Sequence, residues 1–126
     1  MKLLLDTHAF IWWDSEPAKL PGKTLALCQD QANTVLVSVA SVWEMQIKLQ
    51  LGKLKLNLSL AEMVESQRQT NNIEVLPIFL AHTLALENLP AHHKDPFDRL
   101  LIAQANVENA IGCDFTLMYF SKRHSA

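Results

Sequence analysis

Four acidic side chains lie at or just beyond apolar stretches of the sequence: Asp6, Glu44, Asp95 and Asp98. Asp6 follows Lys-Leu-Leu-Leu, Glu44 lies within Ser-Val-Trp-Glu-Met, and the two others occur in Lys-Asp-Pro-Phe-Asp-Arg. Carboxylates gathered beside a core repel one another unless a cation neutralises them. A hard divalent ion such as Mg²⁺ or Mn²⁺ suits an all-oxygen site. The pattern therefore indicates a metal centre and phosphoryl chemistry.

The first two of these side chains also have structural explanations. Asp6 is suited to cap a helix that begins near His8. Glu44 precedes Lys48 by four residues, which is the favourable order for an ion pair on a helix. Taken singly, each structural role is the preferred interpretation. The conjunction of several acidic positions is what favours a site.

The two aspartates near residue 95 allow the same two interpretations. Asp95 precedes Pro96, as an N-cap residue precedes a proline in the first helical turn. Asp98 then falls in that first turn, where a carboxylate suits the helix dipole or pairs with Lys94. A cap does not require both acids, and residues three apart share one helix face.

Hydrophobic periodicity and turn residues predict alternating strands and helices, which is typical of a parallel sheet covered on both faces. In such α/β sheets ligands bind beyond the carboxyl ends of the strands, where Asp6 is placed. Gly52 and Ser59 supply a helix stop and a helix cap. The expected strands are 2–5, 34–38 and 73–78, and the expected helices are 8–13, 23–31, 39–51, 59–70, 79–88 and 96–110.

Length and composition fit one domain over residues 1–126. Hydrophobic residues make up 49% of the 126 residues, and the formal net charge of −2 does not favour a non-specific nucleic-acid binder. Cys28 and Cys113 lack metal-ligand spacing, so we expect two isolated buried thiols. The short apolar run at the N-terminus is no signal peptide, and no apolar stretch is long enough for a membrane span. We therefore expect a soluble, cytoplasmic protein.

Three segments together resemble the motifs of a PIN-domain protein of the VapC toxin type. They are Leu-Leu-Leu-Asp-Thr-His-Ala-Phe-Ile-Trp-Trp (3–13), Ser-Val-Ala-Ser-Val-Trp-Glu-Met-Gln-Ile-Lys (38–48) and His-His-Lys-Asp-Pro-Phe-Asp-Arg-Leu-Leu-Ile-Ala-Gln-Ala (92–105). The resemblance spans residues 1 to about 110 in the family's order and spacing. Any one motif alone is weak, whereas the three in order are specific.

The resemblance implies a three-layer α/β/α sandwich with a central parallel sheet. It implies a Mg²⁺- or Mn²⁺-dependent endoribonuclease, the toxin of a type II toxin–antitoxin pair, which leaves a 5′-phosphate and a 3′-hydroxyl. By motif, Asp6, Glu44 and Asp98 are catalytic metal ligands, Asp95 is a weaker ligand, and the Thr7 hydroxyl orients a carboxylate or ligand water. The implied partners are a cognate antitoxin, RNA and a second copy of the chain, with no membrane.

Positive and apolar side chains near the motifs suggest binding surfaces. Lys48 and Lys94, with Arg99 in support, are placed to hold an RNA backbone near the carboxylates, and a solvated helix end is the equal alternative. The tryptophans are more consistent with packing than with base stacking. The leucines between the second motif and Ser59 are too many for a solvated loop and suit a groove for an antitoxin helix or a second copy. They are Leu49, Leu51, Leu54, Leu56, Leu58 and Leu60.

The C-terminal residues 111–126 depart from the family's pattern. Asp114, the candidate fourth carboxylate, comes early, and the strand before it is reduced to Ile111 and Gly112, with 116–120 as a replacement strand. The alternative function is therefore a catalytically impaired PIN-like module that binds antitoxin or RNA without cleaving it. A DNA nuclease with the same site also stays open, since the metal does not distinguish the sugars. A phosphohydrolase with Asp6 as nucleophile is disfavoured, because residue 8 is His where Asp-x-Asp would be expected.

Overall fold

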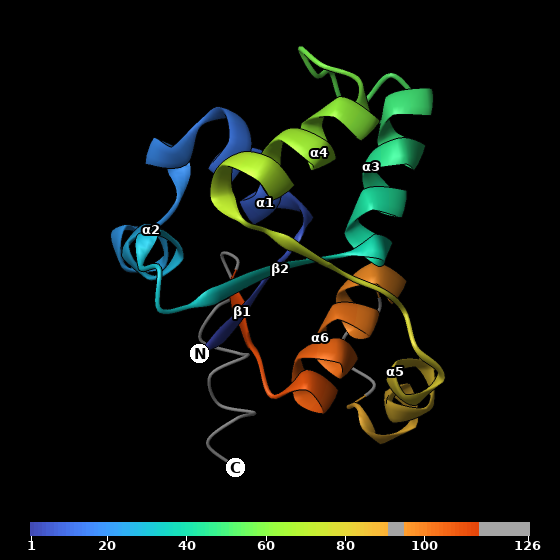
Figure 1. Cartoon of the computed structure of the whole chain (residues 1–126). Coiled ribbons are helices and arrows are strands. Elements are labelled where there is room, and N and C mark those ends of the chain that lie inside the picture. The colour runs from blue at the N-terminus through green and yellow to red at the C-terminus, as the bar shows by residue number, and fades with distance from the viewer. Residues whose placement is uncertain (91–94, 114–126) are drawn as a thin grey trace.

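The computed structural model describes residues 1–90 and 95–113, and its framework is a parallel β-sheet (Figure 1). The strands lie in the order β3-β2-β1-β4, and every pairing is parallel. The strands expected at 2–5 and 34–38 are confirmed. The third is shorter than expected, because Pro77 has no N–H with which to continue the ladder. The bounds are β1 (Lys2–Leu5), β2 (Thr34–Ser38), β3 (Glu74–Leu76) and β4 (Ile111–Cys113).

Helices fill the connections between the strands, close to the expected bounds. The helix expected at 79–88 is divided into α5 and a 3₁₀ turn, Leu86–Asn88. Ser59 and Glu62 form the expected capping box of α4, and Gly52 follows α3 with a φ of 72°. No helix within the described residues is long and apolar enough to cross a membrane. The bounds are α1 (Thr7–Ser15), α2 (Gly22–Gln29), α3 (Val39–Gln50), α4 (Leu60–Asn71), α5 (Leu80–Ala85) and α6 (Pro96–Glu108).

Apolar side chains form a separate cluster on each face of the sheet. Leu3 and Leu5 of β1 face a cluster that includes Phe10 of α1, Cys28 of α2 and Met63 of α4. The residue between them in β1, Leu4, faces the other cluster, which includes Leu101 and Ile102 of α6. This alternation follows from the two-residue period of a strand. Helices therefore cover both faces, and the expected three-layer α/β/α architecture is confirmed (Figure 1).

The strand order creates one special position in the sheet. From β1 the chain proceeds outward to β2 and β3, and it then returns to place β4 on the opposite side of β1. Such a reversal is a topological switch point, and ligand sites of open α/β sheets lie outside the carboxyl ends of the strands there. The residue directly after β1 is Asp6. The fold thus puts the first candidate carboxylate at the expected location.

A buried histidine joins α5 to α6. The His82 side chain is fully buried, and its Nδ1 accepts a hydrogen bond from the Phe79 N–H at 3.0 Å. The ring therefore carries its proton on Nε2 and donates it to Glu108 Oε2 at 2.8 Å. Glu108 in turn pairs with Lys2 at 3.8 Å. This network fixes α6, whose first turn carries Asp95 and Asp98, against the rest of the domain.

We expect His82→Ala to lower the free energy of unfolding by about 3 kcal/mol, because it leaves a cavity and unpaired polar groups in a buried place. The corresponding fall in Tm is roughly 10 °C for a domain of this size. Glu108→Gln is the matched control, since its amide oxygen still accepts from Nε2. Urea unfolding and calorimetry measure both. A loss below about 1 kcal/mol in His82→Ala would show that the network contributes little.

Candidate functional site

Asp6 is held at the carboxyl end of β1 by its own backbone and side chain. It is the N-cap of α1, and its Oδ1 accepts a hydrogen bond from the Ala9 N–H at 2.8 Å. Its own N–H donates to the carbonyl of Cys113 in β4 at 3.2 Å. Only 6% of the residue is exposed. The structural role as a cap is confirmed, and it leaves the carboxylate fixed at the switch point.

Thr7 connects the first motif to the second. Its side chain is buried, and its Oγ1 donates to Glu44 Oε1 at 2.6 Å across 37 positions of sequence. The other carboxylate oxygen of Glu44 faces Lys48 Nζ at 3.3 Å, so the expected helical ion pair is also confirmed. Glu44 is 16% exposed at its side chain. Glu44, which belongs to α3, therefore lies beside Thr7, the residue that follows Asp6.

The third motif reaches the second through an aromatic contact. Trp43, next to Glu44, meets Phe97, next to Asp98, edge to face with ring centroids 5.2 Å apart. The side chain of Asp95 caps α6: Oδ1 accepts from the N–H groups of Phe97 at 2.8 Å and of Asp98 at 3.2 Å. Asp95 therefore has the structural role expected for a residue before Pro96, and Asp98 does not serve as the cap.

Arg99 donates hydrogen bonds to the segment that precedes α6. Its Nη1 donates to the carbonyl of Pro90 at 2.9 Å, and its Nη2 donates to the carbonyl of Leu86 at 3.3 Å. These bonds tie the first turn of α6 to the segment before residue 91. Arg99 therefore holds the start of α6 against the preceding segment, and the supporting role expected of it at the site stays a prediction.

Several expected residues lie outside the described residues. These are Lys94, Asp114 and the replacement strand at 116–120. Among residues 1–90 and 95–113, no three His, Cys, Asp or Glu side chains come close enough to hold a metal ion. The described donors fit Mg²⁺ or Mn²⁺ in kind, because they are hard oxygen ligands, but a complete ligand set is not assembled from them. The ligand assignment of Asp6, Glu44 and Asp98 stays a prediction.

One polar residue that sequence reasoning did not single out bears on this fit. Ser41 is 1% exposed, and its Oγ has no hydrogen-bond partner within the described part of the chain. Ser41 lies one helical turn before Glu44, on the same face of α3. A buried hydroxyl without a partner loses free energy, so it favours a water or ligand beside the Glu44 carboxylate. The spacing of Ser41 and Glu44 was a signal available in the sequence.

The hydrophobic candidates divide into packed and exposed side chains. Trp12 and Trp13 pack against the cluster around Leu3 and Leu5, as expected, whereas Trp43 is 58% exposed. Among the leucines after α3, positions 54, 56 and 60 pack on the same cluster. Leu51 and Leu58 are exposed. The segment therefore lies partly in the core and partly on the surface, and its role as a groove for a partner stays a prediction.

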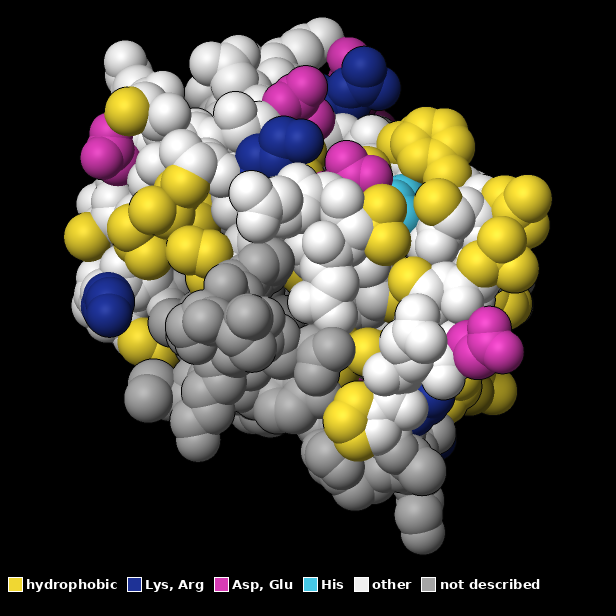
Figure 2. All heavy atoms as spheres, turned by 90° about the horizontal axis from the view of Figure 1, so that it is seen from below, with side chains coloured by type: hydrophobic (Ala, Val, Ile, Leu, Met, Phe, Trp, Pro, Cys, Tyr) yellow, Lys and Arg dark blue, Asp and Glu magenta, His cyan; other side chains and the backbone are white. Residues whose placement is uncertain are grey.

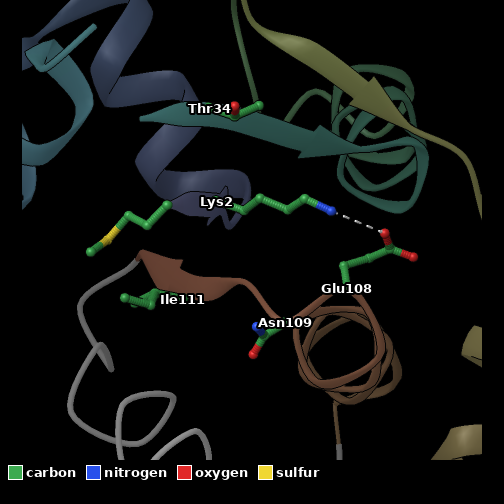
Figure 3. Close-up of a pocket in the computed structure, with 6 residues that line it drawn as sticks. Lys2, Thr34, Glu108, Asn109 and Ile111 are labelled. Carbon is green, nitrogen blue, oxygen red and sulfur yellow. Dashed lines mark ion pairs between the residues drawn. The ribbon is translucent and has the colours of Figure 1, made fainter. Parts of the chain in front are cut away.

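A separate hollow lies at the amino ends of the strands, and none of the candidate site residues lines it. Its volume is about 580 Å³, and Figure 3 shows Lys2 reaching across it toward Glu108. Its lining residues stand at the amino ends of β1 and β2 and at the end of α6. It is therefore not the position where a parallel sheet binds its substrate.

The comparisons with known proteins agree with the fold. The sequence profile of the PIN domain matches residues 3–118. The chain belongs to the PIN domain family. Among solved structures it is similar to VapBC2 from Rickettsia felis bound to a DNA fragment from its promoter, with a TM-score of 0.63 and 17% identity. That match covers 89% of this chain and 85% of the other. No curated protein matches the chain.

The PIN match extends into the C-terminal part of the chain that departs from the motif pattern, as far as residue 118. It begins at Leu3, within the buried cluster, and ends four residues beyond Asp114. The strand expected to be reduced to two residues is β4, which has three residues and pairs with β1 from Leu3 to Leu5. The edge of the PIN sheet is therefore present as far as Cys113.

Proposed function

We propose that this PIN domain is a metal-dependent endoribonuclease of the VapC toxin type, with Asp6, Glu44 and Asp98 as metal ligands. The observation that carries the proposal is the Thr7–Glu44 hydrogen bond of 2.6 Å, which joins the first two acidic motifs at the switch point of the sheet. Hydrolysis of a phosphodiester needs positive charge beside the phosphate, and clustered carboxylates are how a nuclease holds it. Asp95 and Asp114 are assisting ligands in this proposal.

The side chains have distinct roles in this mechanism. When bound, Mg²⁺ or Mn²⁺ supplies a nucleophilic water at neutral pH and neutralises charge on the phosphoryl oxygens. Thr7 holds the Glu44 carboxylate in one orientation, and the helix cap at Asp6 does the same for the first ligand. Lys48, beside Glu44, and Lys94 are proposed to attract the RNA backbone.

The test is cleavage of a structured RNA pool by the purified full-length chain in Mn²⁺, Mg²⁺ or EDTA. We expect cutting with either ion and none in EDTA, with 5′-phosphate and 3′-hydroxyl ends. Cyclic phosphate ends, or cutting in EDTA, would contradict the proposed chemistry. A folded protein that binds RNA but cuts with neither ion would support the impaired binding module instead. A DNA pool run in parallel separates the two nuclease classes.

We also propose that an antitoxin covers the surface beside α3 and α4. The carrier of this proposal is the exposure of Leu51 at 62% and of Leu58 at 49%, on a segment whose other leucines pack inward. Apolar side chains exposed beside a core are typical of a surface that a partner covers. The solved relative is itself named as a VapBC complex. The antitoxin in this proposal is a small protein encoded beside the toxin.

A second apolar surface suits a second copy of the chain. We define the α5 patch as Ile78, Phe79, Leu80 and Leu84, of which Leu80 is 73% exposed. Figure 2 shows apolar side chains gathered on the side of the molecule that carries α5. An exposed apolar patch of this kind can be shared by two copies of the chain in a two-fold dimer. We propose the homodimer on this ground.

Two double variants separate these surfaces. We expect Leu51→Asp with Leu58→Asp to weaken antitoxin binding at least about tenfold, because buried charge replaces apolar contact. The same variant should sediment as the wild type does. Leu80→Asp with Leu84→Asp should do the reverse, giving a monomer that still binds antitoxin. Calorimetric titration and sedimentation measure both, and an exchange of the two outcomes would assign the surfaces the other way round.

A further inference from the structure

The two cysteines of the chain are not isolated, contrary to the expectation from their spacing. Both are buried, at 7% exposure for Cys28 and 0% for Cys113. Both belong to the buried cluster around Leu3 and Leu5, where the Cys113 side chain lowers the pKa of the Cys28 thiol and burial opposes that effect. The Cys113 Sγ donates to the Ile111 carbonyl at 3.8 Å. The two residues are distant in sequence, and the fold alone brings them together.

The sheet register explains why these side chains meet. Cys113 of β4 pairs with Leu5 of β1, and residues paired in this way point to the same face of a sheet. That face carries the cluster containing Leu3 and Leu5, to which Cys28 of α2 also belongs. Thr24 and Cys28, one turn apart, form the buried side of α2. The contact is therefore fixed by core packing from both sides.

A small polar reagent has a route to this pair. Cys28 lines a hollow of about 490 Å³ between α1, α2 and the end of α4. The wall of this hollow is rich in amide and carboxyl groups, including Gln29, Asn33 and Asn72. Trp13 also lines it, and its buried Nε1 has no partner among the described residues. Such a wall offers hydrogen bonds to a small oxidant such as hydrogen peroxide.

We propose that Cys28 and Cys113 are a redox modification site, in which peroxide converts the two thiols into an intramolecular disulfide. The Cys28 sulfur attacks one peroxide oxygen, the O–O bond breaks, and a sulfenic acid and water result. The Cys113 sulfur then attacks the Cys28 sulfur, so that the S–S bond forms and the S–O bond breaks. The hydroxyl leaves with the Cys113 proton as a second water. The protein loses two electrons to the peroxide, and a thiol reductant reverses the change.

The proposed disulfide lies next to Asp6, at the carboxyl end of β1. The carbonyl of Cys113 accepts the backbone N–H of Asp6 at 3.2 Å, so the edge strand and the first acidic residue share one hydrogen bond. A disulfide of about 2.05 Å is shorter than any non-bonded contact between two sulfurs, so its formation draws α2 and β4 toward each other. The modification is thus placed to act on the geometry around Asp6. This inference does not depend on nuclease activity.

The test treats the full-length protein with hydrogen peroxide and counts the free thiols after denaturation. We expect both thiols to be lost to alkylation, a mass lower by about 2 Da, and a cross-linked peptide joining Cys28 to Cys113 within one chain. Dithiothreitol should restore both thiols. Two free thiols in the oxidised protein, or cross-links found only between chains, would overturn the proposal.

Single variants keep the result interpretable. Cys28→Ser and Cys113→Ser each leave one thiol, so neither can form the internal bond, and each should instead advance to sulfinic acid under the same peroxide treatment. Circular dichroism checks that both variants are folded. If wild type also ends as two sulfinic acids without passing through a disulfide, the thiols are not a resolving pair and the proposal is wrong.

Discussion

Replacing Asp6 by asparagine is expected to lower metal-dependent RNA cleavage by about 10²-fold or more while leaving the fold intact. The loss follows from charge, because a neutral amide neither balances a divalent cation nor binds it as strongly as a carboxylate does. The fold survives because Oδ1 of Asp6 is used to accept the Ala9 N–H. Asparagine caps a helix about as well as aspartate. The substitution therefore separates the proposed catalytic role from the observed structural one.

The matched control is Asp30→Asn. Asp30 also accepts a backbone N–H, from Ala32 at 2.9 Å, but it is exposed and lies after α2, at the amino end of the sheet. We expect it to cleave as the wild type does. Initial rates in Mn²⁺ and the Tm are measured for both variants. An Asp6→Asn protein that is folded and within threefold of wild-type activity would remove Asp6 from the metal site.

The sheet and its helices were largely predictable because their signals are local. The β1 and β2 segments are short and rich in apolar or β-branched residues. The capping pair Ser59 and Glu62 can be recognised from its three-residue spacing. The strand order is less local. It places Asp6 at a switch point only because the chain returns past β1 to form β4. Periodicity placed Asp6 after the first strand, but only the observed strand order shows that this strand lies at the reversal.

Contacts between distant residues were beyond what the sequence alone indicates. The Thr7–Glu44 hydrogen bond spans 37 positions, and the resemblance implied only that Thr7 orients some carboxylate or water. Cys28 and Cys113 were expected to be isolated, because no spacing rule relates residues that only a sheet register brings together. Trp43 shows a third case. Val42 precedes it and Met45 lies two residues on, yet the helix phase that buries Met45 leaves Trp43 more than half exposed.

The structural and functional interpretations of the acidic residues were posed as alternatives, and the structure shows why they need not be. The cap at Asp6 and the Glu44–Lys48 pair are both present, and both hold a carboxylate in one orientation. A fixed carboxylate loses less entropy when it binds a cation than a mobile one does. The structural roles are therefore compatible with ligation at these two positions.

The aspartates of the third motif are expected to respond very differently to the same substitution. Asp98→Asn should lower cleavage by about 10²-fold or more, whereas Asp95→Asn should stay within about fivefold of wild type. Oδ1 of Asp95 accepts hydrogen bonds from two backbone N–H groups of α6, and the amide oxygen of asparagine can accept the same two bonds. The N–H of Asp98 donates to Asp95, whose side chain is the cap, so Asp98→Asn leaves that cap in place.

Asp95→Ala tests the structural half of this argument. Loss of the cap should destabilise the protein by about 1 kcal/mol, which lowers the Tm by a few degrees. Because the cap precedes the turn that carries Asp98, a moderate fall in activity should accompany it, and Mn²⁺ at higher concentration should restore part of that fall. Asp98→Asn should show no such recovery and little change in Tm. The rate as a function of Mn²⁺ concentration distinguishes the two.

The reverse result would change the chemistry assigned to this PIN domain. If Asp95→Asn is inactive and Asp98→Asn is active, the metal must draw a ligand from the N-cap position. Oδ2 of Asp95 would then bind the cation, because Oδ1 accepts the two N–H groups. Equal and small losses in both variants would leave only Asp6 and Glu44 as strong ligands from the described residues. Two carboxylates seldom suffice without substrate phosphate, so metal affinity would then depend on bound RNA.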